Sequence, residues 1–176
     1  AIGHSARDTL YMLNDIGLSM VKKPFAMGLR IEHLQKNINK ALYGDFAEHS
    51  ALTNASYKLA VHLENGRGVY TFCMCPGGFV VGAASEEGRL VTNGMSNFDR
   101  AGKNANAALL VSVTPEDFPG DNVLSGVEFQ RKIEENAFMA GGGNWRAPCQ
   151  LVGDFLLGEK SKSVGRIEPS FSNGFA

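Results

Sequence analysis

The chain has 176 residues, a length that suits one domain and is too short for two domains that each bury a proper core. Lys plus Arg number 17 and Asp plus Glu number 18, so the formal net charge is -1 and the positive excess typical of proteins that bind nucleic acids or membrane surfaces is absent. Hydrophobic residues make up 44% and charged residues 20%, which excludes the composition of a disordered chain.

The first residues and the cysteines bear on localisation. No apolar run approaches the roughly 20 residues of a membrane span, and the opening AIGHSARD lacks the basic start and apolar stretch of a signal peptide. Three cysteines, an odd number, argue against a disulfide framework and for reduced thiols. We therefore expect a cytoplasmic protein.

The first third of the chain predicts two helices around one strand. Apolar spacing predicts a helix over residues 5–16, with Ser5 as its N-cap and Gly17 at its end. Alternating apolar and polar residues predict a half-buried strand over 25–31. Four-residue apolar spacing then predicts a short helix over 34–42.

The middle of the chain predicts an antiparallel meander. Four short strand-like segments are separated by two to five turn-forming residues, which leaves no room for crossover helices. A polar loop, another apolar strand and a long helix follow, then a short helix within 148–158 and a loosely ordered tail over 159–176. The fold class is therefore α+β, a mainly antiparallel sheet of five to six strands with two main helices packed against it. These later strands are expected over 57–63, 69–75, 79–84, 89–93 and 108–113, and the long helix over 125–140.

Cys73 and Cys75 lie two positions apart in an expected strand, so both should project from one face. A disulfide between them is disfavoured without a bulge at Pro76. Zinc would need two further ligands, and neither Cys149 nor any of the four histidines has paired ligand spacing. We expect no metal. Two alternatives stay open for the thiols: unreactive packing, or a role as a substrate-facing or redox-tuned thiol.

Polar residues at three other places are candidates for binding. Strand alternation puts Arg30 and Glu32 on one face and His33 on the other. Arg30 suits a carboxylate or phosphate, the alternative being a structural pair with Glu32 or a neighbouring strand. His4, Arg7 and Asp8 stand at the opening of the first helix, where backbone N–H groups favour an anion, although Asp8 could instead complete a capping box with Ser5. The third place is the long loop, whose neutral hydrogen-bonding residues could bind a substrate or simply stabilise turns. These residues are Asn93, Ser96, Asn104 and Asn106.

Long strings of the sequence resemble a bacterial family described as uncharacterised FAD-dependent, or NAD(FAD)-utilising, dehydrogenases. These strings are AIGHSARDT, KPFAMGLRIEH, YTFCMCPGGFVVGAASEEGRLVTNGMS, NANAALLVSV, GVEFQRKIEENAF and GGGNWRAPCQLVGDFL, and they cover nearly the whole chain. Members of that family are much longer and contain a Rossmann-type FAD-binding region. That region is divided in the sequence, and its last part follows the segment that this chain resembles. The chain accordingly resembles an excised middle domain.

The resemblance implies an inserted substrate domain that lies over the isoalloxazine ring, while FAD in the full-length protein supplies the redox chemistry. The partners it implies are the FAD-binding domain of the same polypeptide and an unknown small-molecule substrate, with no nucleic acid and no membrane. Gly3 and His4 resemble the turn that passes beside the cofactor. The candidates to face the substrate are Arg7, Asp8, Arg30, Glu32, Cys73, Cys75, Asn93, Ser96, Asn104 and Asn106.

The chain alone contains neither G-x-G-x-x-G nor a P-loop, so we expect it to hold no FAD and to be inactive. No catalytic role in the family transfers to any of the candidate residues. Two alternative functions remain at this point. One is a non-catalytic module that recognises a small anion or a protein partner, and the other is a thiol or metal domain that uses Cys73 and Cys75.

Overall fold

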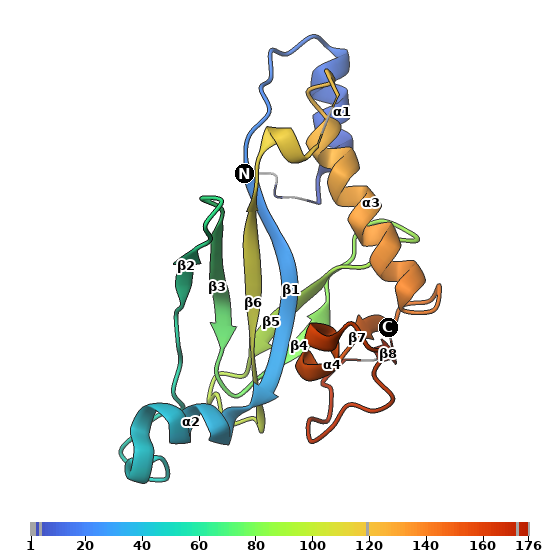
Figure 1. Cartoon of the computed structure of the whole chain (residues 1–176). Coiled ribbons are helices and arrows are strands. Elements are labelled where there is room, and N and C mark those ends of the chain that lie inside the picture. Colours follow the sequence, from blue (N-terminus) through green and yellow to red (C-terminus); the bar gives the residue numbers. More distant parts are fainter. Residues whose placement is uncertain (1–2, 4, 119, 172, 176) are drawn as a thin grey trace.

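The structure is a computed structural model that describes residues 3, 5–118, 120–171 and 173–175 (Figure 1). It confirms the α+β class with an antiparallel sheet. The helices are α1 (Arg7–Asp15), α2 (Gln35–Tyr43), α3 (Ser125–Ala140) and α4 (Val152–Leu157), with short 3-10 turns η1 (Gly44–Phe46) and η2 (Pro115–Asp117). The strands are β1 (Phe25–Leu34), β2 (Ala60–His62), β3 (Gly68–Cys75), β4 (Gly78–Gly82), β5 (Thr92–Ser96), β6 (Asn104–Val113), β7 (Ala147–Cys149) and β8 (Asn173–Phe175).

The main sheet has four antiparallel strands in the order β1-β6-β3-β2. In Figure 1 these strands stand side by side, with α1 and α3 beside their upper end and α2 at their lower end. The strands β1 and β6 pair without interruption from Phe25 opposite Val113 to Leu34 opposite Asn104. The strand β6 therefore begins four residues earlier than predicted, because pairing with β1 satisfies the backbone of the polar residues that resembled a loop.

The predicted single meander is wrong in its pairing order. Neighbours β2 and β3 pair, and so do β4 and β5, but β3 pairs with β6 and the β4–β5 hairpin forms a sheet of its own. The chain leaves β3 at Gly77, whose φ of +54° and close contact with the Arg100 carbonyl permit no side chain. A third small sheet pairs β7 with β8 in parallel.

Helix α1 differs from its prediction at the N-terminus. It begins at Arg7 with Ala6 as N-cap and no side-chain cap, so the roles predicted for Ser5 as cap and for Asp8 in a capping box are wrong. The Asp8 carboxylate instead accepts a hydrogen bond from the Thr9 amide at 2.8 Å. Gly17 does take the left-handed φ of +79° that ends the helix.

The buried apolar core is small for a chain of this length. An aromatic cluster of Phe25, Phe118 and Phe129 joins β1 to α3, with ring centroids 5.4 to 6.4 Å apart. Large apolar side chains stay exposed on both faces of the main sheet: Leu29 is 61% exposed on one face and Phe72 is 60% exposed on the other. Such side chains mark surfaces that another part of a protein can cover.

Candidate functional site

Four strands bring polar side chains together on one face of the main sheet. Arg30 of β1 donates from Nη1 to Asn106 Oδ1 of β6 at 2.7 Å and from Nη2 to Asn93 Oδ1 of β5 at 3.3 Å. Cys75, at the end of β3, pairs opposite Asn106 in the strand register. We call Arg30, Asn93, Cys75 and Asn106 the Arg30 cluster.

Gly94 lets the β4–β5 hairpin approach this cluster. A Cβ atom at position 94 would lie 2.2 Å from Asn106 Oδ1, 2.4 Å from Arg30 Nη1 and 3.0 Å from Cys75 Sγ. Any side chain would therefore displace the guanidinium or the amide. The sequence offered a weak signal for this contact, because Asn93-Gly94 is also an ordinary turn dipeptide.

A β-bulge places Cys75 in the cluster. The register of β3 against β6 shifts between Phe72 and Cys75, and Cys73 adopts a left-handed φ of +47°. The extra residue moves Cys75 to the face of Asn106, where it is buried, and leaves Cys73 exposed. The bulge breaks the strand alternation on which the prediction of two thiols on one face rested, and the two thiols differ in burial.

The Cys75 thiol is held protonated. Its Sγ donates to the Cys73 carbonyl at 3.3 Å. Burial raises the pKa of the Cys75 thiol above its ordinary value, and the neighbouring Cys73 adds to this effect, while Arg30 and Ser96 oppose it. A protonated, buried thiol is a poor nucleophile, so Cys75 contributes shape and polarizability to the cluster.

Asn106 is fully buried, with 0% of its surface exposed. A guanidinium can only donate hydrogen bonds, so the atom facing Arg30 is the amide oxygen. The amide nitrogen Nδ2 then has no acceptor among the described residues. A buried donor left without an acceptor costs about 1–3 kcal/mol, and such a group calls for an explanation.

Arg30 keeps its positive charge uncompensated. Both groups that accept hydrogen bonds from its guanidinium are neutral amides, and no described carboxylate lies within 4.0 Å of its nitrogen atoms. In contrast, Arg7, Arg67, Arg89 and Arg131 each form an ion pair with an Asp or Glu. The structural alternative for Arg30, a pair with Glu32, is not formed, although the expected contact with a neighbouring strand is.

Glu32 and Asn104 border the Arg30 cluster. Glu32 accepts from Asn104 Nδ2 at 3.1 Å and from both the backbone and the hydroxyl of Ser170. Asn104 also donates to the Glu168 carbonyl at 2.9 Å, so this edge of the cluster is joined to the C-terminal segment. His33 lies on the opposite face, as predicted, against the Tyr57 hydroxyl at 2.7 Å, and burial lowers its pKa.

Ser96 has a local structural contact. Its hydroxyl donates to the Pro76 carbonyl at 3.0 Å, which ties β5 to the turn after β3. Gly3 is exposed, with a φ of +70°. His4 lies outside the described residues, so the prediction that Gly3 and His4 pass beside a flavin stays a prediction.

The structure places Arg7 in a separate ion network. Arg7 is only 2% exposed, and it donates to Glu86 at 2.6 Å, to Glu134 at 2.6 and 2.9 Å and to Gln130 at 3.1 Å. The Arg7 guanidinium, which was predicted to bind an external anion, is therefore already bound by carboxylates of this chain. Asp8, its neighbour, is exposed.

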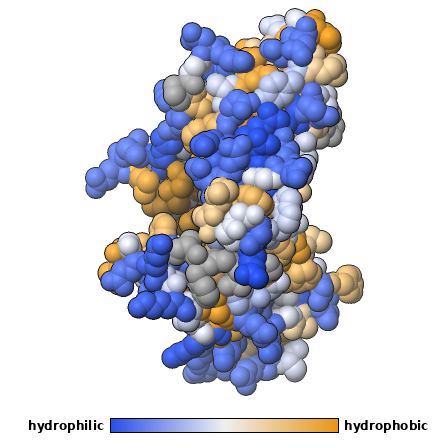
Figure 2. Space-filling view, turned by 90° about the vertical axis from the view of Figure 1, so that its right-hand side faces the viewer, coloured by the Kyte–Doolittle hydropathy of each residue, from blue (hydrophilic) through white to orange (hydrophobic). Residues whose placement is uncertain are grey.

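Glu86 connects this network to the β4–β5 hairpin. It lies between β4 and β5, and it pairs with Arg131 at 2.6 Å and with Arg7 at 2.6 Å. Hydrogen bonds from Arg131 and Arg7 lower the pKa of Glu86 to about 2. Figure 2, which views the molecule from the right-hand side of Figure 1, shows hydrophilic residues gathered in the upper half of that face. Two pairs of this network, Glu86 with Arg89 and Glu128 with Arg131, are three residues apart. The pairs of Glu86 with Arg7 and with Arg131 join distant positions that no local sequence pattern connects.

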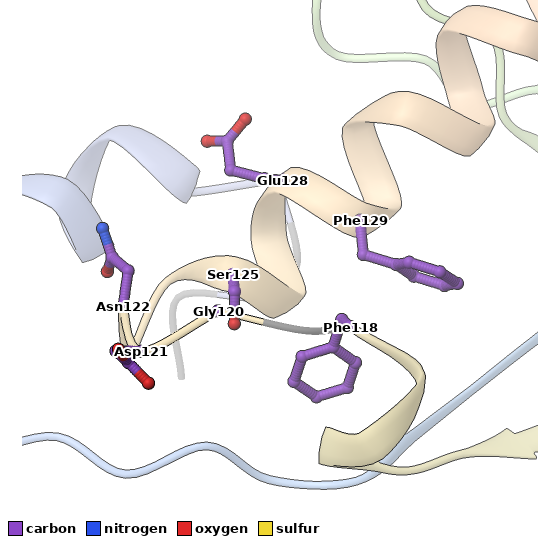
Figure 3. Close-up of a pocket in the computed structure, with 7 residues that line it drawn as sticks. All are labelled: Phe118, Gly120, Asp121, Asn122, Ser125, Glu128 and Phe129. Carbon is purple, nitrogen blue, oxygen red and sulfur yellow. The ribbon is translucent and has the colours of Figure 1, made fainter.

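Two surface hollows of about 380 Å³ each lie elsewhere. The first is beside the aromatic cluster, where the rings of Phe118 and Phe129 and the carboxylate of Glu128 point in different directions (Figure 3). The second lies at the start of α2, between Lys36 and Lys103. Neither hollow includes a member of the Arg30 cluster.

The described residues form neither a metal-ligand cluster nor a membrane-spanning helix. Among the residues that the structure describes, no three His, Cys, Asp or Glu side chains gather as metal ligands would. None of the helices in the described ranges combines the length and apolar character needed to cross a bilayer.

A dinucleotide cradle does not fit the described part of the chain. Holding the pyrophosphate of FAD requires a strand, a glycine-rich turn and a helix N-terminus. Helices α2 and α4 follow strands closely, but their N-caps are Leu34 and Leu151. The three consecutive glycines at 141–143 follow the end of α3 and do not precede a helix.

The fold and this cluster define a small α+β domain that offers an unpaired cation and amide groups. The chain belongs to the family described as FAD-dependent protein, C-terminal domain-like, whose model matches residues 24–176. It is 54% identical over 176 residues to an uncharacterized protein of Clostridium beijerinckii, across 99% of this chain and 33% of that protein. The chain thus spans about a third of this relative's length. The family is one of FAD-dependent proteins, which supports an association with FAD in the parent protein.

Proposed function

We propose that this chain is the substrate domain of a FAD-dependent oxidoreductase, covering the flavin, contributing substrate contacts and having no activity alone. FAD, held by the rest of the polypeptide, supplies the redox chemistry. The family and the chain's share of its relative's length support this proposal. The family description refers to a C-terminal domain, whereas the sequence resemblance suggested a middle domain, so the place of this domain in the whole polypeptide stays a prediction.

The observation that carries the proposal is the Arg30 cluster. Within a few ångströms of each other it holds a buried thiol, a guanidinium and a buried amide donor, and the last two have no carboxylate and no acceptor, respectively, among the described residues. A fold gains little stability from such an arrangement, whereas a substrate site uses polar groups that are already oriented. Glu32 and Asn104, at the border of the cluster, add further polar groups to the proposed substrate site.

Exposed apolar residues support contact between this face and the FAD-binding part of the same polypeptide. Phe72 lies in the same cross-strand row as Arg30, with Ala108 between them. Its 60% exposed ring beside a polar cluster has the character of an interface edge. The relative is about three times as long as this chain, which provides the polypeptide to cover it.

Energy transfer to the flavin tests which face of the main sheet is turned toward the cofactor. In the full-length protein, a coumarin label whose emission overlaps flavin absorption is attached at Phe72→Cys or at Leu29→Cys. Both carry Cys73→Ser, because that thiol is exposed. The two positions are matched, since they are 60% and 61% exposed and lie on opposite faces.

We expect more efficient transfer from position 72 than from position 29, each compared with the same protein after removal of FAD. The Cys73→Ser parent, labelled alone, corrects for the remaining thiols. Equal transfer, or greater transfer from position 29, would contradict the proposal that the Arg30 face covers the flavin.

A further inference from the structure

The guanidinium of Arg30 is oriented without being neutralised. It has five N–H groups, of which two point to amide oxygens, and the other three have no acceptor among the described residues. An amide oxygen fixes the direction of a guanidinium as a carboxylate would, but it leaves the full positive charge available. The other arginines that hold this domain together all use carboxylates.

One edge of the guanidinium is anchored and the other is open. The bond from Nη1 to Asn106 is short, at 2.7 Å, and part-buried. The bond from Nη2 to Asn93 is longer, at 3.3 Å, and lies at the exposed side. A ligand with two oxygens could therefore replace the weaker bond and use the parallel N–H groups of the fork, while Asn106 keeps the arginine in place.

A second observation also indicates a missing acceptor at this place. Asn106 is fully buried beside Arg30, and its Nδ2 donor has no partner in the described part of the chain. Buried polar groups are normally satisfied, so an orphan donor beside an uncompensated cation indicates a polar group from outside the described residues.

We infer that Arg30 and Asn106 form a subsite for the carboxylate group of a small molecule. The binding claim depends on the cluster alone, and identifying that molecule as the substrate rests on the function proposed above. A single guanidinium matches the single charge of a carboxylate. A phosphate dianion would need a second cation, which the hydrogen bonds of the cluster do not supply, and it would meet Glu32, which projects from the same face.

Protection from an arginine-modifying reagent tests this subsite residue by residue. The full-length protein is treated with phenylglyoxal, and mass spectrometry follows the modification rate at each arginine. Acetate and inorganic phosphate are the two ligands, added at constant ionic strength with chloride as the balancing ion. Arg146, which is exposed and distant in sequence, serves as the internal reference.

We expect acetate to slow the modification of Arg30 by about tenfold once its concentration reaches ten times the dissociation constant. Arg146 should not change. The inference is overturned if acetate protects Arg30 no more than Arg146, and its carboxylate class is overturned if phosphate protects better than acetate.

An internal carboxylate provides a second test. Asn106→Asp has the same shape as the native residue and places a negative charge beside Arg30, so Arg30 should be modified slowly without acetate and show no further protection. Persistent protection by acetate in this variant would contradict the inference. If the variant does not fold, the measurement on the native protein still decides the question.

The outcome is separable from that of the proposed function. Protection of Arg30 without the expected energy transfer from position 72 would leave a carboxylate subsite and remove the flavin-covering role. Energy transfer without protection would remove the subsite alone.

Discussion

Two polar clusters, one around Glu86 and one around Arg30, attach the β4–β5 hairpin to the rest of the domain. Carboxylates neutralise the arginines of the first cluster, whereas amide oxygens orient the arginine of the second. At the connection between β4 and β5, Glu86 pairs with Arg7 and Arg131. At β5 itself, Asn93 accepts from Arg30, which also donates to Asn106. Charges that are internally neutralised hold elements together, whereas a charge oriented by neutral amides remains available to a ligand.

The largest expected effect concerns FAD, because neither cluster includes a cradle for its pyrophosphate. Titration of the 176-residue chain with FAD, followed by calorimetry or fluorescence, should show no saturable binding at micromolar concentrations, where ~8 kcal/mol would be required. Tight, stoichiometric binding would mean that this chain holds a complete flavin site, and the substrate-domain proposal would fail.

The second effect tests the structural cluster. Arg7→Met leaves Glu134 and Glu86 with less neutralising charge in a buried setting, so the free energy of unfolding should fall by about 3–5 kcal/mol. Chemical denaturation measures this loss, with Arg146→Met as the control that removes one exposed charge. A loss below about 1 kcal/mol would place the Arg7 network among ordinary surface ion pairs.

The third effect tests the binding cluster. Gly94→Ala puts a methyl group where Asn106 Oδ1 and Arg30 Nη1 now lie, so stability should fall by about 1–3 kcal/mol and acetate should no longer protect Arg30. Gly153→Ala is the matched control, because a Cβ there meets nothing within 4 Å, and it should raise stability by about 0.4–1 kcal/mol. Unchanged protection in Gly94→Ala would mean that β5 does not position Arg30.

The smallest effect is one of thiol reactivity. Because burial raises the pKa of Cys75, its reactive thiolate forms at higher pH than that of an ordinary thiol, and its alkylation rate should lag behind that of exposed Cys73 from pH 7 to 9. Residue-resolved mass spectrometry measures both rates. Comparable rates at pH 7 would show that the cluster opens readily.

A related replacement separates function from packing. In the full-length protein, changing Cys73 and Cys75 together to Ser should impair turnover or flavin reduction more than folding. Cys73→Ser alone is the control for the exposed position. Unchanged kinetics with lost stability would instead assign Cys75 a packing role.

Part of this arrangement could be predicted from the sequence. Alternation correctly put Arg30 and Glu32 on one face of β1 and His33 on the other, because strand geometry is local. Glycine at position 17 also ended the first helix as predicted. The start of β6 was missed, since Asn104 and Asn106 have low strand propensity and only pairing with β1 overrides it.

What the sequence determined by itself is the α+β class, most of the local elements and the chemistry of the candidate side chains. The tertiary structure decided which of them meet. It paired β3 with β6 and turned Cys75 onto the Asn106 face through a bulge. It also gave Arg7 carboxylate partners, whereas it oriented Arg30 through two amide oxygens. These outcomes depend on contacts between residues tens of positions apart, whose energies no local pattern in the sequence records.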